Sequence, residues 1–386
     1  MQKVDLIATA TFGLEAVVAE EVKALGYHDV QVENGKVQYR ADLSAIARSN
    51  LWLRTADRVR LKIGEFRATT FDELFEQTKA LPWADWISED AAFPVEGKSV
   101  KSTLFSVSDC QAIVKKAVVE SLKKTYKRDW FEEKGPLYKI EVALHKDVAT
   151  LTIDTSGPGL HKRGYRGLIG TAPLKETMAA AMILLSRWKP DRILMDPFCG
   201  SGTIPIEAAL IGQNIAPGMN REFVSEAWPV IPRSIWREAR AETHDLARYE
   251  QKLEIIGTDA DDEILKVARR NAGEAGVDDL IHFQRMDVRD IRSKRKYGYL
   301  ICNPPYGERL GEWKQVSRLY GEMGRTFAAE LDTWSFYIIT SDEQFEEHFG
   351  RTASKKRKLY NGNIKVDYYQ FYGPKPPRPA VVAPGE

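Results

Sequence analysis

The feature that most constrains this fold is an apolar run that ends in an acid and a glycine-rich turn, Ile193 to Thr203. The apolar residues before Asp196 suit a buried parallel strand. Gly200 and Gly202 permit positive φ and leave no side chain between the backbone and a ligand. Pro205 then fits the first turn of a helix, where its missing N–H has no intrahelical partner. The stretch predicts a strand, a tight loop and a helix start that could hold a cofactor, with a buried turn as the alternative.

The residues around the glycines narrow the kind of cofactor. The dinucleotide fingerprint G-x-G-x-x-G and the Gly-Lys-Ser/Thr of phosphate-binding loops are both absent here. Asp196 precedes the glycines, and a carboxylate there repels a pyrophosphate. It can hold a cation, such as the ammonium group of S-adenosylmethionine (SAM).

Three further strand ends carry polar residues. Asp259 closes the apolar run from Ile255, at the position that grips ribose hydroxyls in a doubly wound sheet, although it could also be a helix N-cap. Asp287 follows the strand from Ile281 and could accept a hydrogen bond from an adenine amino group. Asn303-Pro304-Pro305-Tyr306 ends a strand that begins at Tyr299.

These four segments resemble the motifs of class I SAM-dependent methyltransferases, and Asn-Pro-Pro-Tyr resembles the motif of those that methylate an exocyclic or amide nitrogen. The segments LHKRGYR (160–166), APLKE (172–176) and NPPYGERL (303–310) are similar to those of THUMP-domain guanine-N2 RNA methyltransferases of the RlmL/YpsC type, which act on large-subunit ribosomal RNA. The resemblance covers nearly the whole chain except its tail. It implies an α/β fold in which N-terminal ferredoxin-like and THUMP α+β domains precede a Rossmann-like class I SAM methyltransferase domain.

The resemblance also implies a site. The side-chain carbonyl of Asn303 and the backbone carbonyl of Pro304 would accept the two amino hydrogens of the base, and Tyr306 would stack on it. A helix is expected to begin at 171–173, with Thr171 as its cap and Pro173 in its first turn. We expect SAM to contact the start of this helix and the strand ends: Pro173, Asp196, Phe198, Gly200, Gly202, Thr203, Asp259, Ala260, Asp287, Val288 and Asn303. A pyrimidine-C5 methyltransferase would instead need a nucleophilic cysteine near this loop, where Tyr306 stands.

Composition bounds the remaining classes. The 386 residues are 43% hydrophobic with a net charge of +1, so a nucleic-acid surface must be a local patch. Cys110, Cys199 and Cys302 lie far apart, which suggests neither a metal site nor a disulfide framework. No signal pattern or membrane-spanning run is present. We therefore expect a cytoplasmic protein with no metal and no membrane partner, and the sequence does not predict an oligomeric state.

The N-terminal half predicts two α+β units. Residues 1–65 fit a ferredoxin-like β-α-β-β-α-β unit, and 66–158 resemble a THUMP domain, which implies RNA binding. A helix there, over 109–128, carries a basic run that is either an RNA-binding surface or a solvated face. The expected RNA contacts are Lys115, Lys116, Lys123, Lys124 and Lys127, together with Lys162, Arg163 and Arg166 beside the linker 156–159.

The C-terminal half, 159–374, is expected to be the methyltransferase domain. A segment over 214–254 could carry function or pack as a lid, and the sequence does not decide between them. A hairpin turning at Asn361-Gly362-Asn363 suits the antiparallel end of such a sheet. Residues 375–386 are predicted to be a disordered tail.

The substrate class stays open at this point. We expect methyl transfer to the N2 amine of a guanine in RNA, with ribosomal RNA ahead of transfer RNA. DNA adenine and protein glutamine methyltransferases share the Asn-Pro-Pro-Tyr motif. A non-catalytic RNA-binding assembly factor that keeps a vestigial SAM fold is the alternative outside enzymes.

Overall fold

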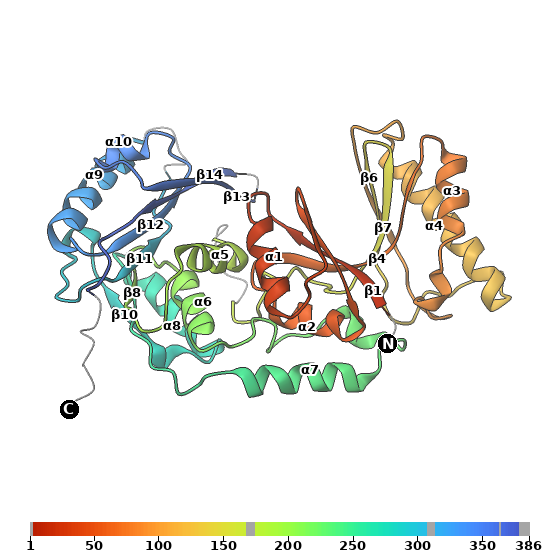
Figure 1. Cartoon of the computed structure of the whole chain (residues 1–386), viewed down its shortest axis with the longest axis horizontal. Coiled ribbons are helices and arrows are strands. Elements are labelled where there is room, and N and C mark those ends of the chain that lie inside the picture. Colours follow the sequence, from red (N-terminus) through yellow and green to blue (C-terminus); the bar gives the residue numbers. More distant parts are fainter. Residues whose placement is uncertain (1–2, 167–173, 307–312, 363, 378–386) are drawn as a thin grey trace, which may run out of the picture. The chain divides into compact units, whose positions relative to one another are not determined.

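The computed structural model describes residues 3–166, 174–306, 313–362 and 364–377. The chain forms two compact units (Figure 1). Met1–Arg163 and Ile215–Ala247 make the first unit, and Gly164–Asn214 and Arg248–Glu386 make the second. The sequence predicted one domain over 159–374. In the structure, the segment 215–247 belongs to the first unit, and the boundary near the linker falls after Arg163.

The first unit is built on one seven-stranded sheet in the order β2-β3-β1-β4-β7-β6-β5. All pairings are antiparallel except that of β5 with β6. Its strands are β1 (Lys3–Ala10), β2 (Val30–Glu33), β3 (Lys36–Asp42), β4 (Ala56–Arg67), β5 (Val95–Val100), β6 (Ile140–His145) and β7 (Val148–Asp154).

The two predicted N-terminal units share this sheet. β4 has 12 residues: its first part pairs with β1 of the ferredoxin-like half, and its last part, from Arg60, pairs with β7 of the THUMP half. The pairing of β4 with β7 joins the two halves, and one continuous apolar cluster runs beneath both.

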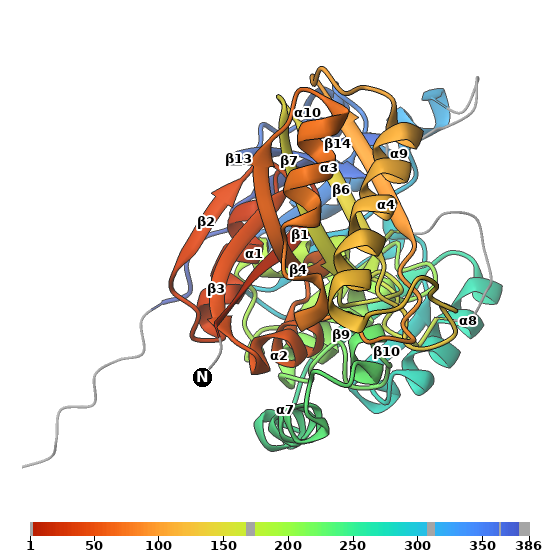
Figure 2. The same ribbon diagram turned by 90° about the vertical axis from the view of Figure 1, so that its right-hand side faces the viewer.

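The helices of the first unit complete its core. α3 and α4 lie side by side against the THUMP half of the sheet, as Figure 2 shows from the side. The helical segments are α1 (Glu15–Ala24), α2 (Ser44–Trp52), α3 (Phe71–Lys79), η1 (Trp83–Asp85), α4 (Val107–Tyr126), η2 (Val224–Ala227) and α7 (Arg233–Leu246).

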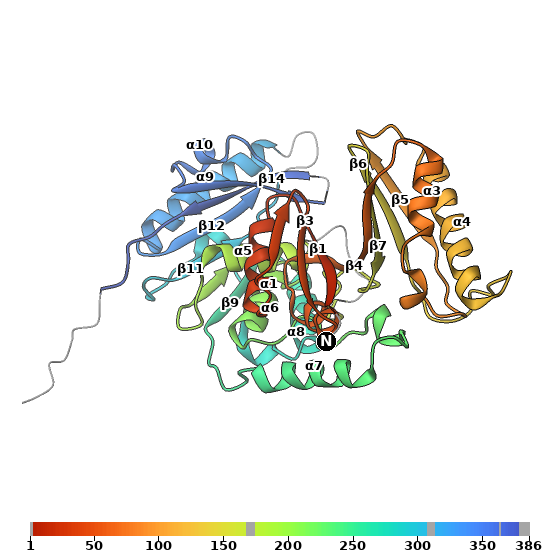
Figure 3. The ribbon, with the colours of Figure 1, turned by 45° about the vertical axis from the view of Figure 1, so that its right-hand side comes forward.

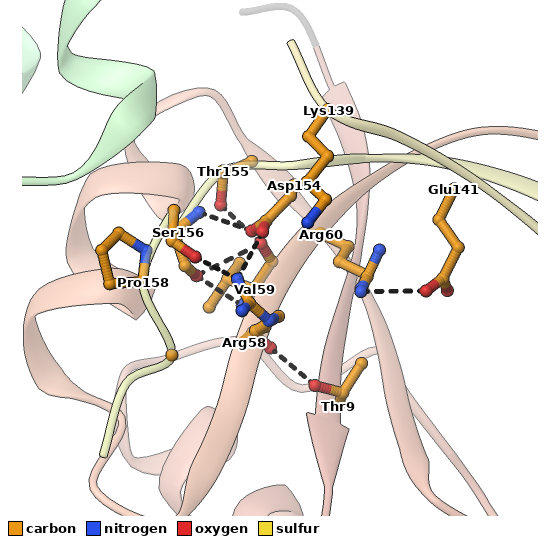
Figure 4. A network of polar contacts seen from close by, with 12 residues as sticks. Thr9, Arg58, Val59, Arg60, Lys139, Glu141, Asp154, Thr155, Ser156 and Pro158 are labelled. Carbon is orange, nitrogen blue, oxygen red and sulfur yellow. Dashed lines mark hydrogen bonds and ion pairs between the residues drawn. The ribbon is translucent and has the colours of Figure 1, made fainter. Parts of the chain in front are cut away.

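The chain that leaves β7 is fastened to β4 (Figure 4). Arg58 donates to Asp154 Oδ2 over 2.5 Å and also to the carbonyl of Gly157. The Val59 amide donates to Ser156 Oγ over 2.8 Å. These bonds make the start of the expected linker a fixed part of the first unit.

The segment 215–247 also belongs to the first unit. Trp228 is 1% exposed, its ring stacks on Tyr138 at a centroid distance of 4.4 Å, and its Nε1 donates to the Leu137 carbonyl. α7 packs on α2, where Arg48 forms a two-fold contact of 2.7 Å per bond with Glu242. The segment is therefore a structural layer of the first unit.

The second unit holds a seven-stranded sheet in the order β10-β9-β8-β11-β12-β14-β13. The first five strands in this order are parallel, and β14 and β13 are antiparallel additions. The strands are β8 (Leu194–Asp196), β9 (Ile255–Asp259), β10 (Ile281–Arg285), β11 (Tyr299–Cys302), β12 (Ser335–Thr340), β13 (Lys355–Asn361) and β14 (Ile364–Phe371). The chain order reverses between β8 and β11, and ligands bind at such switch points.

Helices cover both faces of this sheet, which makes the unit a Rossmann-like three-layer fold (Figure 3). α5, α6 and α8 pack on one face, and α9 and α10 pack on the other. The helical segments are α5 (Glu176–Ser186), α6 (Thr203–Gly212), α8 (Asp262–Glu274), η3 (Asp278–Leu280), η4 (Val288–Asp290), α9 (Trp313–Glu330) and α10 (Phe345–Phe349). The fold class predicted from the sequence is confirmed.

Candidate active site

The turn between β8 and α6 forms the floor of the candidate site. Gly200 and Gly202 have φ of +51° and +85°, which explains why glycine stands at both positions. A Cβ at Gly200 would meet nothing within 4 Å, so its backbone faces open space. A Cβ at Gly202 would lie 3.2 Å from Ala268 Cβ, so this glycine lets α6 approach α8.

Asp196 ends β8 and is buried, with 1% of its surface exposed. Its Oδ1 accepts a hydrogen bond of 3.0 Å from the Phe198 amide. Burial, and to a lesser extent the charge of Asp259, raises its pKa well above the ordinary value of an aspartate. A buried carboxyl in this state favours a cationic partner.

Asp259 connects the ends of β9 and β8. Its Oδ2 accepts from the Gly200 amide and its Oδ1 from the Asp261 amide, each over 3.0 Å. The N-cap of α8 is Asp261, which accepts from the Glu263 amide. Asp259 is thus not a helix cap, and the alternative raised by the sequence is wrong.

Asp287 follows β10 and caps η4. Its carboxylate accepts from the backbone amide of Arg289 and forms a two-fold ion pair with that side chain, with bonds of 2.7 and 2.8 Å. The hydrogen bond to Arg289 lowers the pKa of Asp287. The carboxylate is therefore ionised and accepts hydrogen bonds.

A side chain of α9 holds the loop that follows β11. Tyr320 is fully buried, donates its hydroxyl to the Pro305 carbonyl over 2.7 Å, and lies 2.9 Å from Thr340 Oγ1. Above it, the Tyr306 hydroxyl donates to the side-chain oxygen of Asn303. The amide of Asn303 is thus held at the mouth of the loop.

These strand ends surround one pocket of about 680 Å³. It is lined by Lys175, Pro197, Phe198, Asp259, Ala260, Met286, Asp287, Val288, Asn303, Pro304, Pro305, Tyr306, Leu319, Asn361, Gly362 and Ile364. Its size is in the range of pockets that hold small molecules.

The pocket brings together most of the residues that the sequence singled out, but not all. Asp196, Gly200, Gly202 and Thr203 are not among the lining residues, and Pro173 lies outside the described residues. The expected helix start at 171–173 is also outside them, and the described helix α5 begins at Glu176.

Sequence reasoning missed several lining residues. Met286 and Leu319 give no chemical signal, because apolar residues at such positions look like core. Asn361 and Gly362 were recognised as a turn, but only the strand order places that turn at the pocket.

The thiols near the pocket are unsuited to nucleophilic attack. Burial raises the pKa of both Cys199 and Cys302, and nearby Asp196 adds to the effect. A neutral buried thiol is a poor nucleophile. The arrangement therefore disfavours a cysteine-based pyrimidine methyltransferase.

Two of the predicted RNA contacts are engaged elsewhere. Arg163 is 4% exposed and donates to the carbonyls of Leu160 and Arg54, so it cannot reach RNA in the folded chain. Arg166 donates to Thr203 Oγ1 and lies 3.4 Å from Glu176. It ties the start of α6 to the start of α5, and we remove both arginines from the RNA-binding set. Lys162 is exposed.

The lysines of α4 fall into two groups. Lys115 pairs with Glu133 at 2.5 Å and Lys123 with Glu120 at 3.1 Å. Lys116, Lys124 and Lys127 are exposed and have no acidic partner within the described part of the chain. Only these three offer charges that are not already neutralised.

The residues present fit SAM. A Cβ at Gly200 would meet open space, and the pocket is lined by the Asp259 carboxylate and by apolar side chains such as Phe198 and Val288, which suit a ribose and a base. No cluster of three metal-ligating side chains occurs among the described residues. Within the same residues, no helix is long and apolar enough to cross a membrane.

Three protein-family patterns match the chain in order. Residues 5–60 match the RlmL ferredoxin-like domain, 68–154 the THUMP domain, and 163–370 the RMKL-like methyltransferase domain. The last match covers more than half of the chain and includes every residue of the pocket.

Individual relatives are similar over nearly their whole length. A Bacillus subtilis (strain 168) protein named "Putative RNA methyltransferase YpsC" is 57% identical over 374 residues, which cover 96% of this chain and 97% of that protein. A crystal structure from Listeria monocytogenes str. 4b F2365, described as a predicted N6-adenine-specific DNA methylase, is 59% identical with a TM-score of 0.93, covering 97% of each chain.

A third relative carries the product form of the cofactor. The crystal structure of SMU.472, described as a putative methyltransferase complexed with SAH, is 49% identical with a TM-score of 0.92, and the match covers 98% of this chain and 100% of that one. SAH is what SAM becomes when its methyl group leaves. Together with the fit of the pocket, this establishes SAM as the cofactor.

Proposed function

The chain belongs to the RMKL-like methyltransferase family, and from that premise we propose that it methylates the exocyclic N2 amine of a guanine in RNA, and that this RNA is large-subunit ribosomal RNA in the cytoplasm. The observation that carries the proposal is the position of Asn303 and Pro304 in the pocket that Asp259 and Phe198 also line. The loop that we propose to bind the amine and residues that we propose to bind the cofactor therefore line the same pocket.

Methyl transfer needs little from the protein beyond alignment of the amine with the methyl group. SAM supplies an electrophilic methyl group on a sulfonium, which is an excellent leaving group. The side-chain oxygen of Asn303 and the Pro304 carbonyl accept the two N–H groups of the amine, which turns the nitrogen lone pair toward the methyl group. Once the C–S bond has broken, the cofactor is left as the neutral thioether SAH, and the methylated nitrogen loses its extra proton to water.

Entry of the base involves one local change. The Tyr306 hydroxyl donates to the Asn303 oxygen in the structure, and in the proposed complex the incoming amine takes its place. In the proposed complex, the Tyr306 ring stacks on a base that has left its RNA helix. Tyr320 keeps the loop in place through the Pro305 carbonyl while this exchange occurs.

RNA as the substrate class rests on the THUMP match and on the name of the Bacillus relative. The exposed lysines Lys116 and Lys124 of α4, Lys127 directly after it, and Lys162 are the residues that we assign to phosphate contacts. The name of the Listeria structure points instead to N6 of adenine in DNA, which the same loop could align.

A direct test compares these substrates with the purified chain. Ribosomal RNA from cells without the gene, transfer RNA and adenine-containing DNA are each incubated with isotopically labelled SAM and digested to nucleosides. We expect label in N2-methylguanosine from the ribosomal RNA. Label in N6-methyladenosine, or in no nucleoside, would contradict the proposal.

A further inference from the structure

The hairpin of β13 and β14 reaches the pocket. Asn361, Gly362 and Ile364 at its tip line the same space as Asn303 and Tyr306. β13 is the outermost strand of its sheet, so one of its backbone edges has no neighbouring strand within the described residues. A chain-like ligand that lies along this edge would reach the mouth of the pocket.

The edge strand carries four consecutive basic residues. Lys355, Lys356 and Lys358 are exposed, and Arg357 is half-buried. Lys356 is 3.3 Å from Asp367 and lies over the ring of Tyr369, so its charge is partly neutralised.

The neighbouring acids do not neutralise the strand. Glu343 is bonded to Lys365 at 2.6 Å, and Lys365 is the main reason that its pKa is lowered, with smaller contributions from Lys356 and Lys358. Lys355 and Lys358 have no ion-pair partner among the described residues. Five basic side chains thus lie near three carboxylates, those of Asp367, Glu343 and Glu346, the last of which accepts from the Ala353 amide. The surface keeps an excess of positive charge.

The spacing fits a ligand with repeated negative charges. A strand rises about 3.3 Å per residue, so Lys358 lies roughly 10 Å and Lys355 roughly 20 Å along the strand from Asn361. Side chains alternate between faces, so both faces of the edge carry positive charge. Because the strand is paired with β14 along its whole length, the backbone positions of this row are fixed, with Lys355 on one face of the edge and Lys358 on the other.

We propose that this row, Lys355 to Lys358, binds the phosphate backbone of the substrate RNA on one side of the base that enters the pocket. The inference rests on the proposed function and adds where the RNA strand runs on the catalytic unit. A flipped base alone gives little affinity, since phosphate contacts supply the greater part of nucleic-acid binding and fix its register.

Another explanation needs no RNA. Lysines on an edge strand also prevent edge-to-edge pairing between molecules. The two explanations differ in what changes when the charges are removed: RNA affinity in one case, the monomeric state in the other.

The test is a double variant, Lys355→Gln with Lys358→Gln, in the full chain. We would measure its affinity for a labelled single-stranded RNA oligonucleotide over a range of KCl concentrations. If both lysines contact phosphates, the log–log salt slope should flatten by about 0.7 per lysine, or roughly 1.4 in all. The affinity for SAM, measured by calorimetry, should not change and reports that the second unit is folded.

A matched control removes the same charge elsewhere on the unit. Lys189 and Lys252 are exposed, have no ion pair among the described residues, and precede β8 and β9, at the opposite end of the parallel strands from the pocket. Lys189→Gln with Lys252→Gln should leave the salt slope at the wild-type value.

The outcomes separate this inference from the proposed function. An unchanged slope in the first variant would overturn the inference, and self-association of that variant with unchanged RNA affinity would assign the lysines to edge protection. A flattened slope would support the surface even if the methylated base proved not to be guanine, since the binding assay involves no methyl transfer.

Discussion

At the residue scale, two carboxyl groups in the floor of the pocket have different tasks. Asp196 is buried with a raised pKa, while Asp259 is half-exposed and accepts from the turn that carries Gly200. A buried carboxyl group that serves to bind a cation lowers the stability of the ligand-free protein. Such a cost in stability is common at binding sites.

Asp196→Asn should therefore stabilise the ligand-free chain and weaken SAM binding. An unfolded aspartate ionises near pH 4 and the folded Asp196 at a higher pH, so the wild type loses stability as the pH rises between these values. The variant lacks this loss and can keep the bond from the Phe198 amide. We expect a gain of roughly 1–2 kcal/mol at neutral pH.

The measurement is chemical denaturation at pH 4 and pH 7 together with calorimetric titration of SAM. The stability gain should be larger at pH 7 than at pH 4. Equal stability of variant and wild type at both pH values would show that the burial of this carboxyl has no cost.

Asn303→Ala tests alignment separately from binding. The proposed contact of Asn303 is to the reacting amine, so SAM affinity should stay within a few-fold while methyl transfer falls by roughly 100-fold or more. Tyr306→Phe is the control, because it keeps the stacking ring and removes the hydroxyl that must leave Asn303. It should retain most of the turnover. Rapid turnover by a folded Asn303→Ala protein would remove Asn303 from its role.

The residues at strand ends could be predicted because acids, glycines and prolines are rare inside strands and have few structural uses there. The sequence could not show that Arg163 and Arg166 are bonded within the protein. An arginine beside a glycine and a tyrosine looks the same whether its partner is a phosphate or a carbonyl. That difference depends on contacts between positions far apart in the chain.

At the element scale, local patterns predicted most helices and strands. The β13–β14 hairpin falls close to where it was expected. β5 was missed, since Val95 to Val100 alternates weakly and has a glycine in its centre. The join between the ferredoxin-like and THUMP halves was missed too, because the end of β4 is polar and only its pairing with β7 makes it a strand.

α4 provides the prediction at this scale. Changing Lys116, Lys124 and Lys127 to glutamine should weaken RNA binding and flatten its salt slope by about 0.7 for each lysine that binds a phosphate in the wild type. The control changes three exposed lysines of the same unit that are paired with glutamates, Lys23, Lys79 and Lys134. Equal salt slopes for the two triple variants would show that these lysines contact solvent and not RNA.

At the scale of the whole molecule, the segment 215–247 interrupts the methyltransferase unit in sequence while its side chains complete the first unit. The sequence suggested either a functional insertion or a lid, because its tryptophans and prolines indicate packing without naming a partner. The partners prove to be Tyr138 and the helix α2.

Trp228→Ala should destabilise the first unit by about 3–5 kcal/mol, since it empties a buried aromatic site. Hydrogen exchange should rise in β6 and β7, and the exchange of β8 and β9 in the presence of SAM should stay as in the wild type. Increased exchange confined to the second unit would contradict the assignment of this segment.

The proposed methylation of guanine N2 in ribosomal RNA can be tested in the cell by nucleoside mass spectrometry on RNA from a strain that lacks the gene. Large-subunit RNA, small-subunit RNA and transfer RNA would be separated and digested individually. We expect loss of N2-methylguanosine from the large-subunit fraction alone, restored by the wild-type chain and not by Asn303→Ala. Intact N2-methylguanosine in that fraction, with loss of another methylated nucleoside or of a transfer RNA modification, would contradict the proposal.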